Sequence, residues 1–232
     1  MNKYDDPLAR ALQTKEIVKR LRTDIILGKY RPGSRLIEAT IATQMGISRA
    51  PIRTSLQMLA QEGLVLNLSN GGTEVVGFSI KHFIDLFDLR LMLEKKALEM
   101  IISSSTFNYR PIFDIMETFD AYRKQTTDKE ITSAETSFLD MQFHRSIINM
   151  LENNPLLVAW NSMANVLQAI LEITNMTSAN FEEFYNDHKR LADLVIQKNP
   201  KCVDELVAHI SKCKDIIVYR MEKIYTSNEI SE

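Results

Sequence analysis

The sequence is poor in residues that break helices, and most of those lie near its start. All seven glycines fall within the first 77 of 232 residues, and the whole chain has only six prolines. Glycine and proline are the residues least compatible with a helix interior, whereas Leu, Met, Glu and Lys favour one. The composition therefore predicts a mostly helical chain, above all after residue 77.

Cysteines and long apolar runs are also scarce. Cys202 and Cys213 lie on one expected helix, and at about 1.5 Å of rise per residue they are too far apart to form a disulfide. The sequence contains no run of about 18 apolar residues, so no membrane span is expected. The first ten residues, MNKYDDPLAR, lack the apolar core of a signal peptide. We therefore expect a cytoplasmic protein with reduced thiols and no membrane partner.

Charge is unevenly distributed along the chain. Residues 1–77 carry 11 Lys or Arg and 7 Asp or Glu, whereas the remainder carries 17 and 23. The first third is therefore net basic, at +4, and the rest net acidic, at −6, although the whole chain carries only −2. Because DNA binding requires local cations to neutralise phosphates, this asymmetry favours a DNA-contacting head on an acidic body.

The first 77 residues alternate short helical patterns with turns. Apolar residues at helical spacing, glycine terminators and Ser48 as an N-cap residue predict three helices. Two short apolar segments separated by Asn70, Gly71 and Gly72 predict a β-hairpin. The expected helices are 9–28, 38–45 and 48–62, and the expected strands are 64–68 and 73–78. This layout predicts a winged helix-turn-helix domain over residues 1–77.

Beyond residue 77 the pattern is helical throughout. Apolar residues recur at intervals of three and four, and short polar breaks separate six stretches. These stretches are roughly 80–104, 109–127, 131–151, 155–176, 179–198 and 200–226. Connections this short suit antiparallel neighbours, so residues 78–232 are expected to form an antiparallel helical bundle. The predicted fold class is mostly α, with a winged helix-turn-helix followed by an all-α bundle.

The helix after the turn carries the candidate DNA-reading residues. In a helix-turn-helix this helix enters the major groove through its N-terminal residues, and here it begins with Ser48, Arg49 and, four residues on, Arg53. An arginine fork suits both phosphate and the edge of guanine, and the free helix N–H groups near Ser48 suit phosphate. From these residues alone, a solvated basic face on a helical hairpin stays open as the alternative.

Three motifs of the head occur together in a known family. They are Pro32-Gly33-Ser34-Arg35-Leu36, Gly46-Ile47-Ser48-Arg49-Ala50-Pro51-Ile52-Arg53 and Glu62-Gly63-Leu64-Val65. In this combination, residues 16–76 closely resemble the DNA-binding domain of the GntR family of bacterial transcription regulators. The resemblance implies DNA contacts by Arg49 and Arg53, a further contact by Arg35, and a wing tip around Gly71 that reaches into the minor groove.

Three positions depart from that family's pattern. Ala39 stands where many members carry a phosphate-binding arginine, and Asn70 stands at a wing tip that is often basic. Thr54 and Ser55 replace the usual Glu-Ala pair. The loss of two cations implies weaker non-specific binding to DNA and a somewhat different operator.

Three of the four histidines lie on apolar helix faces in the body. Asp140 and His144 share one face at i and i+4, while His188 and His209 each belong to an apolar stripe on another helix. Burial of imidazole and carboxylate groups is costly unless each finds a partner. One divalent ion would satisfy all four groups together. The alternative is a set of ordinary core histidines, each with its own hydrogen-bond partner.

The same residues fit a second family pattern. The Asp140–His144 pair, the two later histidines and the segment Leu86–Glu94 give residues 80–225 a resemblance to the FCD effector domain. This domain is the all-helical partner of the GntR head in the FadR-like branch, and six helices match its smaller, VanR-like version. The resemblance implies a metal held by Asp140, His144, His188 and His209, and an effector cavity lined by Arg90. For Arg90, a surface ion pair with Glu94 is the alternative.

Imidazole and carboxylate ligands suit Zn, Ni, Mn or Fe. Four protein ligands would complete a tetrahedral zinc site, whereas a six-coordinate ion would keep positions for water or an effector carboxylate. We expect the second arrangement, with a small organic acid between the ion and Arg90, whose guanidinium would donate two parallel hydrogen bonds. Without the acid, water or Glu94 should pair with Arg90, since an unpaired buried guanidinium is costly.

These observations lead to one hypothesis and two alternatives. The hypothesis is a sequence-specific transcription regulator, preferably a repressor, with no catalytic residues and a small carboxylate effector. Two heads would read an inverted-repeat operator, which implies a homodimer. A metal-dependent hydrolase is the alternative from another class, but it leaves the basic head unexplained. A direct metal sensor, for which the ion itself is the signal, is the other alternative.

Overall fold

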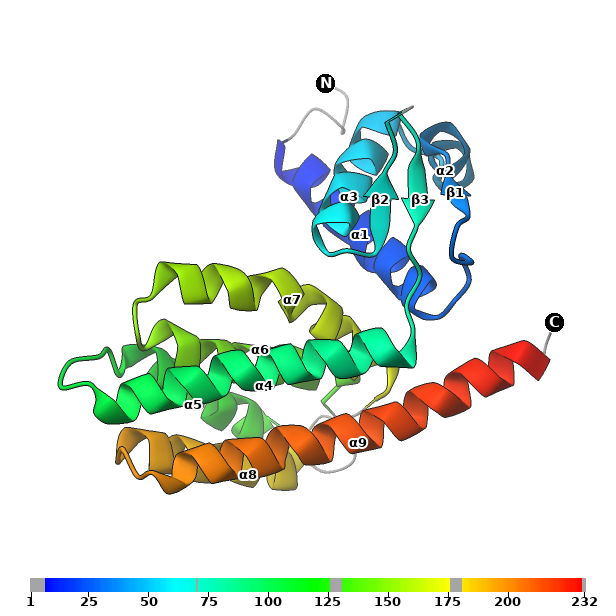
Figure 1. Ribbon diagram of the computed structural model, residues 1–232. Helices are drawn as coiled ribbons and strands as arrows, with labels where there is room; N and C mark the ends of the chain where they lie inside the picture. Colours follow the sequence, from blue (N-terminus) through cyan, green and yellow to red (C-terminus); the bar gives the residue numbers. More distant parts are fainter. Residues whose placement is uncertain (1–6, 70, 126–130, 176–180, 231–232) are drawn as a thin grey trace. The chain divides into compact units, whose positions relative to one another are not determined.

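The computed structural model describes residues 7–69, 71–125, 131–175 and 181–230 (Figure 1). The chain divides into two compact units, one formed by Met1–Ile80 with Ile224–Glu232 and the other by Lys81–Lys223. The first unit combines helices with a small sheet, and the described part of the second unit contains helices without strands. The predicted fold class, mostly α with a winged helix-turn-helix before a helical bundle, is confirmed.

The first unit packs three helices with a three-stranded antiparallel sheet. Its elements are α1 (Pro7–Ile26), β1 (Arg35–Leu36), α2 (Glu38–Met45), α3 (Arg49–Gln61), β2 (Val65–Asn67) and β3 (Thr73–Val75). Strand β3 lies between β1 and β2. Strand β1 was not predicted from the sequence, because two residues are too few to show an alternating pattern. The Asn70 part of the predicted hairpin turn lies outside the described residues.

A tight turn fixes the position of α3 relative to α2. Gly46 follows α2 with φ at 65°, in the left-handed region where glycine has no steric penalty. The N–H of Ile47 then donates to the carbonyl of Ala42 at 3.0 Å. On its inner face α3 buries Ile52 and Leu56, as its spacing predicts. The exposed side of α3 is therefore left to its polar residues.

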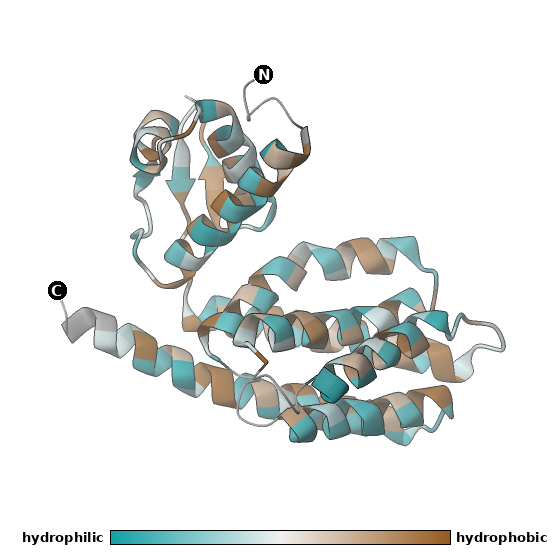
Figure 2. Ribbon diagram, turned by 180° about the vertical axis from the view of Figure 1, so that it is seen from behind, coloured by the Kyte–Doolittle hydropathy of each residue, from teal (hydrophilic) through white to brown (hydrophobic). Residues whose placement is uncertain are grey.

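Six helices form the second unit, except that the end of the last one, from Ile224 on, belongs to the first unit. They are α4 (Ile80–Ser103), α5 (Arg110–Gln125), α6 (Ser133–Asn149), α7 (Asn154–Ile173), α8 (Phe181–Ile196) and α9 (Lys201–Ile230). Helix α6 packs against both α5 and α7, and α5 also packs against α8. Polar and apolar residues alternate along these helices (Figure 2), as expected where one side of each helix is buried. All six predicted helices are present, and the last continues to Ile230 rather than ending near residue 226.

Helix α7 departs from one expectation. Among the described helices it alone is long and apolar enough to cross a membrane by length and composition. Its buried residues include Trp160, Leu167 and Ile170, and it packs along α6. The apolar composition of α7 is therefore explained by its place in the core of the bundle.

Candidate metal centre and DNA-binding surface

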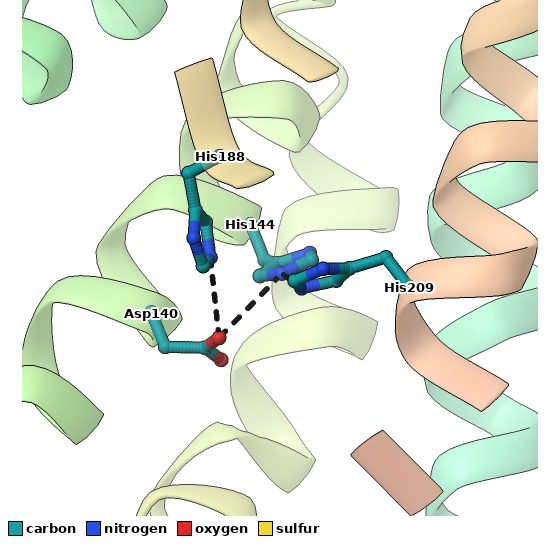
Figure 3. A group of neighbouring side chains, drawn as sticks. All are labelled: Asp140, His144, His188 and His209. Atoms are coloured by element: carbon teal, nitrogen blue, oxygen red, sulfur yellow. Dashed lines mark hydrogen bonds and ion pairs between the residues drawn. The ribbon is translucent and has the colours of Figure 1, made fainter. Parts of the chain in front are cut away.

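Helices α6, α8 and α9 bring four potential metal ligands to one point inside the second unit. Asp140 and His144 come from α6, His188 from α8 and His209 from α9, and their side chains point toward one another (Figure 3). One ligand atom from each residue lies within 4.8 Å of the other three. The sequence placed only the α6 pair on a shared face, and the fold adds the other two residues.

The separations within this cluster suit a shared ion. Asp140 Oδ1 lies 3.3 Å from His188 Nε2 and 3.8 Å from His144 Nε2. His144 Nε2 lies 3.4 Å from His209 Nε2. Atoms bound to one ion at about 2.0–2.2 Å lie roughly 3–3.5 Å from neighbouring ligand atoms. His209 is half-buried and the other three residues are buried, so the group is largely shielded from bulk water.

The ring of His188 carries an unsatisfied nitrogen into the cluster. Its Nδ1 lies 2.7 Å from the carbonyl oxygen of Phe184, which can only accept a hydrogen bond, so Nδ1 carries the proton. In the neutral ring, Nε2 then has a bare lone pair. This buried Nε2 has no hydrogen-bond partner among the described residues, although Asp140 Oδ1 is close to it. Nε2 and Asp140 Oδ1 thus face each other at 3.3 Å without a hydrogen bond between them, an arrangement that a cation bound to both would stabilise.

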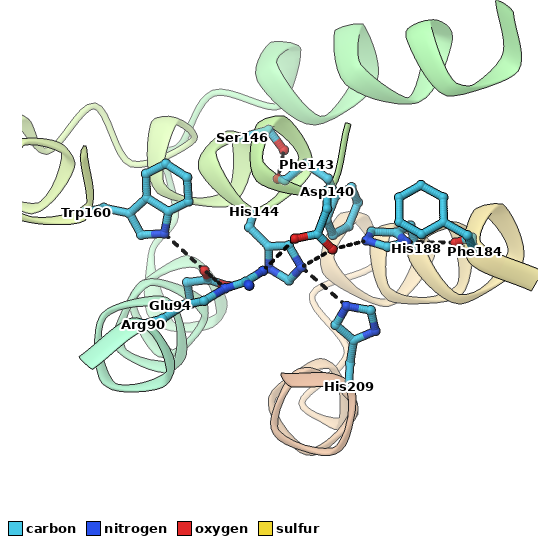
Figure 4. A network of polar contacts seen from close by, with 10 residues as sticks. All are labelled: Arg90, Glu94, Asp140, Phe143, His144, Ser146, Trp160, Phe184, His188 and His209. Atoms are coloured by element: carbon cyan, nitrogen blue, oxygen red, sulfur yellow. Dashed lines mark hydrogen bonds and ion pairs between the residues drawn. The ribbon is translucent and has the colours of Figure 1, made fainter. Parts of the chain in front are cut away.

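A second buried carboxylate, Glu94, supports His144 in addition to forming the ion pair with Arg90 that the sequence predicted. Glu94 on α4 is completely buried, and its Oε2 lies 2.6 Å from His144 Nδ1. Its Oε1 accepts hydrogen bonds from Trp160 Nε1 and Arg90 Nε, both at 3.0 Å (Figure 4). The signal for this role was weak in the sequence, because Glu94 lies 50 residues before His144.

Arg90 links the same network to the cluster of Asp140, His144, His188 and His209. Its Nε binds Glu94, and its Nη2 donates to Asp140 Oδ2 at 3.1 Å. The ion pair with Glu94 is therefore present, but it is buried rather than on the surface, since Arg90 is only 1% exposed. Because Nε and Nη2 already donate to Glu94 and Asp140, Arg90 cannot form the expected pair of parallel hydrogen bonds to an effector in this arrangement. The remaining nitrogen, Nη1, is buried without a partner among the described residues.

Burial and mutual attraction set the charges of the cluster. Burial opposes the charged form of Asp140, but the guanidinium of Arg90 and the nearby histidines hold its pKa well below the ordinary value. Burial and the charge of Arg90 lower the pKa of His144. Burial and the two facing histidines lower the pKa of His209 well below its usual range. At neutral pH the cluster therefore offers an anionic Asp140 and the neutral imidazoles of His144 and His209, the forms that bind metals.

The first unit presents its predicted DNA contacts on exposed positions. Arg49 and Arg53 project from the first turns of α3, and Arg35 lies on the edge strand β1. Arg53 forms a two-point pair with Glu38, Nε to Oε1 and Nη2 to Oε2, both at 2.9 Å. Ser48 occupies the N-cap position of α3 but makes no side-chain cap hydrogen bond. The N–H groups of the first turn of α3 are thus not capped by Ser48.

The hairpin of the first unit has the geometry of a wing. Strands β2 and β3 pair antiparallel, with Leu66 opposite Glu74. Leu68 N–H donates to the carbonyl of Gly72 at 2.8 Å, and Gly71 has φ at 82°, a conformation that favours glycine. Gly71 therefore lies in the turn at the end of the hairpin, as the sequence predicts.

Two family models match the chain. One, described as bacterial regulatory proteins of the gntR family, matches residues 13–75, and the other, described as the FCD domain, matches residues 85–212. The second match alone spans more than half of the chain. The first includes the proposed recognition residues, and the second includes Arg90 and all four residues of the cluster.

Individual relatives agree with these matches. The gluconate operon transcriptional repressor of Bacillus subtilis (strain 168) is 27% identical over 186 residues, which cover 80% of this chain and 74% of that protein. The Nta operon transcriptional regulator of Aminobacter aminovorans is 28% identical over 207 residues, which cover 87% of this chain and 95% of that protein. A solved GntR regulator from Rhodococcus sp. RHA1 has the same fold, with a TM-score of 0.62 at 19% identity. The match covers 89% of this chain and 97% of that one. The families and relatives are transcriptional regulators rather than enzymes, so the hydrolase alternative is not supported.

Proposed function

Because the chain belongs to the GntR family of bacterial regulatory proteins and carries an FCD domain, it is a DNA-binding transcriptional regulator, and we propose that it is a cytoplasmic, homodimeric repressor controlled by a small organic acid. In this proposal residues 1–77 bind an inverted-repeat operator. Residues 78–232 hold a divalent ion and the acid. Each part rests on a separate set of contacts.

The metal part of the proposal rests on one observation above all, the unsatisfied Nε2 of His188. A buried imidazole nitrogen beside an anionic carboxylate is costly without a cation or a proton between them. Asp140, His144, His188 and His209 would hold the ion. Their nitrogen and oxygen donors suit Zn, Ni, Mn or Fe. The ion would supply a positive charge and open coordination positions close to Arg90.

The effector part rests on the buried Nη1 of Arg90. This nitrogen has an N–H donor to offer, and it belongs to a side chain that already donates to Asp140. A small carboxylate could accept from Nη1 and bind the ion with its other oxygen, which shares the acid between two positive groups. Gluconate, which appears in the name of the Bacillus subtilis relative's operon, belongs in the first panel of acids to test.

The DNA part rests on the exposed start of α3. Arg49 and Arg53 would contact the major groove, with the uncapped N–H groups at Ser48 available to a phosphate. Arg35 and the hairpin turn at Gly71 would contact the backbone and the minor groove on either side. Two heads of a dimer would read the two halves of an inverted repeat.

Elemental analysis of protein purified without an affinity tag, followed by mobility shifts on the DNA upstream of its own gene, tests the proposal. We expect about one divalent ion per chain, specific retardation of that DNA, and release by an acid from the panel. Near-zero metal would refute the metal part. Release by the ion alone, with no response to any acid, would favour a direct metal sensor.

A further inference from the structure

Glu94 is the most deeply buried carboxylate beside the candidate metal centre, yet it is not one of the four converging ligands. Its exposure is 0%, and it contacts Arg90, His144 and Trp160 from three different helices (Figure 4). A buried carboxylate of this kind is costly unless it is well bonded. The hydrogen-bond partners of Glu94 therefore indicate its role.

The two oxygens of Glu94 have different partners. Oε1 accepts from two fixed donors, the indole Nε1 of Trp160 and the Nε of Arg90. Oε2 is left for Nδ1 of His144, at 2.6 Å. Burial acts to raise the pKa of Glu94, but His144, Arg90 and Trp160 outweigh it and lower that pKa. Glu94 is thus an anion that only accepts hydrogen bonds.

This pattern decides which nitrogen of His144 carries the proton. Because an ionised carboxylate cannot donate, Nδ1 must donate to Oε2, and the neutral ring keeps its lone pair on Nε2. That Nε2 faces Asp140 at 3.8 Å and His209 at 3.4 Å. The carboxylate also fixes the rotation of the ring, since Oε2 lies on one defined side of it.

We propose that Glu94 is the positioning residue of the metal centre: it holds His144 in the Nδ1–H tautomer with its Nε2 lone pair aimed at Asp140, His188 and His209. The inference rests on the proposed metal site. A carboxylate that accepts from the far nitrogen of a ligating histidine orients the ring and increases its basicity, and loss of such a partner costs about 10–100-fold in metal affinity. Trp160 and Arg90 in turn hold Glu94 in place.

The first test needs no variant. In metal-free wild-type protein, the ¹⁵N chemical shifts of the His144 ring should show a protonated Nδ1 and an unprotonated Nε2, with the signals assigned from their loss in His144→Asn. The opposite tautomer, or a mixture like that of free imidazole, would overturn the inference. A role for Glu94 in packing alone would not fix the tautomer.

The second test compares two glutamates of the same helix by competition of a chelator for Zn²⁺. In Glu94→Gln, the carbonyl oxygen still accepts from Trp160 and Arg90, which turns the amide N–H₂ toward His144 Nδ1. That nitrogen must then accept, so the proton moves to Nε2 and blocks the ion. We expect a 10–100-fold loss of Zn²⁺ affinity. The control is Glu99→Gln, whose side chain is 46% exposed, and it should leave the affinity unchanged.

The outcomes separate this inference from the metal proposal. If wild type binds Zn²⁺ and Glu94→Gln binds it equally well, the role of Glu94 is overturned and the metal site stands. If wild type binds no metal while His144 shows the Nδ1–H tautomer, the metal proposal fails, and Glu94 still stands as the residue that fixes His144.

Discussion

Arg90 donates a hydrogen bond from Nη2 to Oδ2 of Asp140 at 3.1 Å, although the two residues lie on α4 and α6 and are separated by 50 positions in the sequence. The contact joins the proposed effector arginine directly to a proposed metal ligand. An acid that binds Arg90 would weaken the hydrogen bond from Arg90 to Asp140. A change in the charge of the metal would in turn alter the electrostatic interaction of the site with Arg90. Metal and effector binding are therefore expected to be coupled, and the coupling must be equal in both directions.

The recognition helix can be tested by removing its arginines. Arg49→Ala should cost about 1–3 kcal/mol of specific operator binding if its side chain reads a base. Arg53→Ala should also weaken binding, although its pair with Glu38 must first be broken for Arg53 to reach DNA. Fluorescence anisotropy with operator and with scrambled DNA measures both. Lys96→Ala, which removes an exposed cation of α4, is the control. Full affinity in both arginine variants would show that α3 is not the recognition helix.

Metal removal should lower thermal stability. An ion that binds only the folded state adds about 2.7 kcal/mol when its free concentration is 100 times Kd. Chelator should therefore lower the Tm of wild-type protein. It should have no effect on the Tm of His188→Gln, which lacks one of the four ligands. Differential scanning calorimetry with and without chelator gives the comparison. Equal melting of wild type in the two conditions would contradict a folded-state ion.

The effector site can be tested through Arg90. Arg90→Lys keeps a positive charge near Glu94 and Asp140 but loses the separate Nη1 donor. We expect wild type to bind an acid from the panel and Arg90→Lys to bind it at least tenfold more weakly, by isothermal titration calorimetry. Arg110→Lys, at an exposed position on α5, is the matched control. If an acid that releases DNA binds Arg90→Lys and metal-free protein as tightly as wild type, the effector pocket lies elsewhere.

Acid should destabilise the metal-free protein. Burial lowers the pKa of both His144 and His209, so these histidines are neutral when folded and take up protons when unfolded below about pH 6.5. The folded state is then disfavoured, and stability falls as pH drops below that value. One pH unit below that value, each histidine should lower the free energy of unfolding by about 1 kcal/mol. Urea unfolding between pH 7.5 and 5.5 measures the slope, and His209→Asn should make it shallower. A flat profile in wild type would contradict the buried neutral histidines.

Trp160 should report on the metal centre. It is the only tryptophan of the chain, and its indole N–H donates to Glu94, which in turn binds His144. Binding of an ion to His144 Nε2 makes Nδ1–H a stronger donor, which redistributes charge on Glu94 beside the indole. We expect the emission of Trp160 to shift on titration with Zn²⁺ and to stay unchanged in His144→Asn. A shift of equal size in that variant would assign the signal to metal bound elsewhere.

The sequence by itself determined the local structure and the chemistry it could carry. The spacing of Ile52 and Leu56 gave α3 its buried face, and Gly46 placed the turn before it, because helix periodicity and a left-handed backbone depend on neighbouring residues only. The i, i+4 spacing of Asp140 and His144 placed both on one side of α6 for the same reason.

The tertiary structure alone decided which of these residues meet. His209 contacts His144 from 65 positions away in the sequence, and Glu94 accepts a hydrogen bond from His144 across 50 positions. Arg90 lies buried between two carboxylates instead of on the surface. These distances depend on how α4, α6 and α9 pack, and helix pairing follows from the shapes of many side chains together rather than from the period of any one helix. The sequence could therefore place each polar group on a buried face, but only the packed bundle could determine which other group would satisfy it.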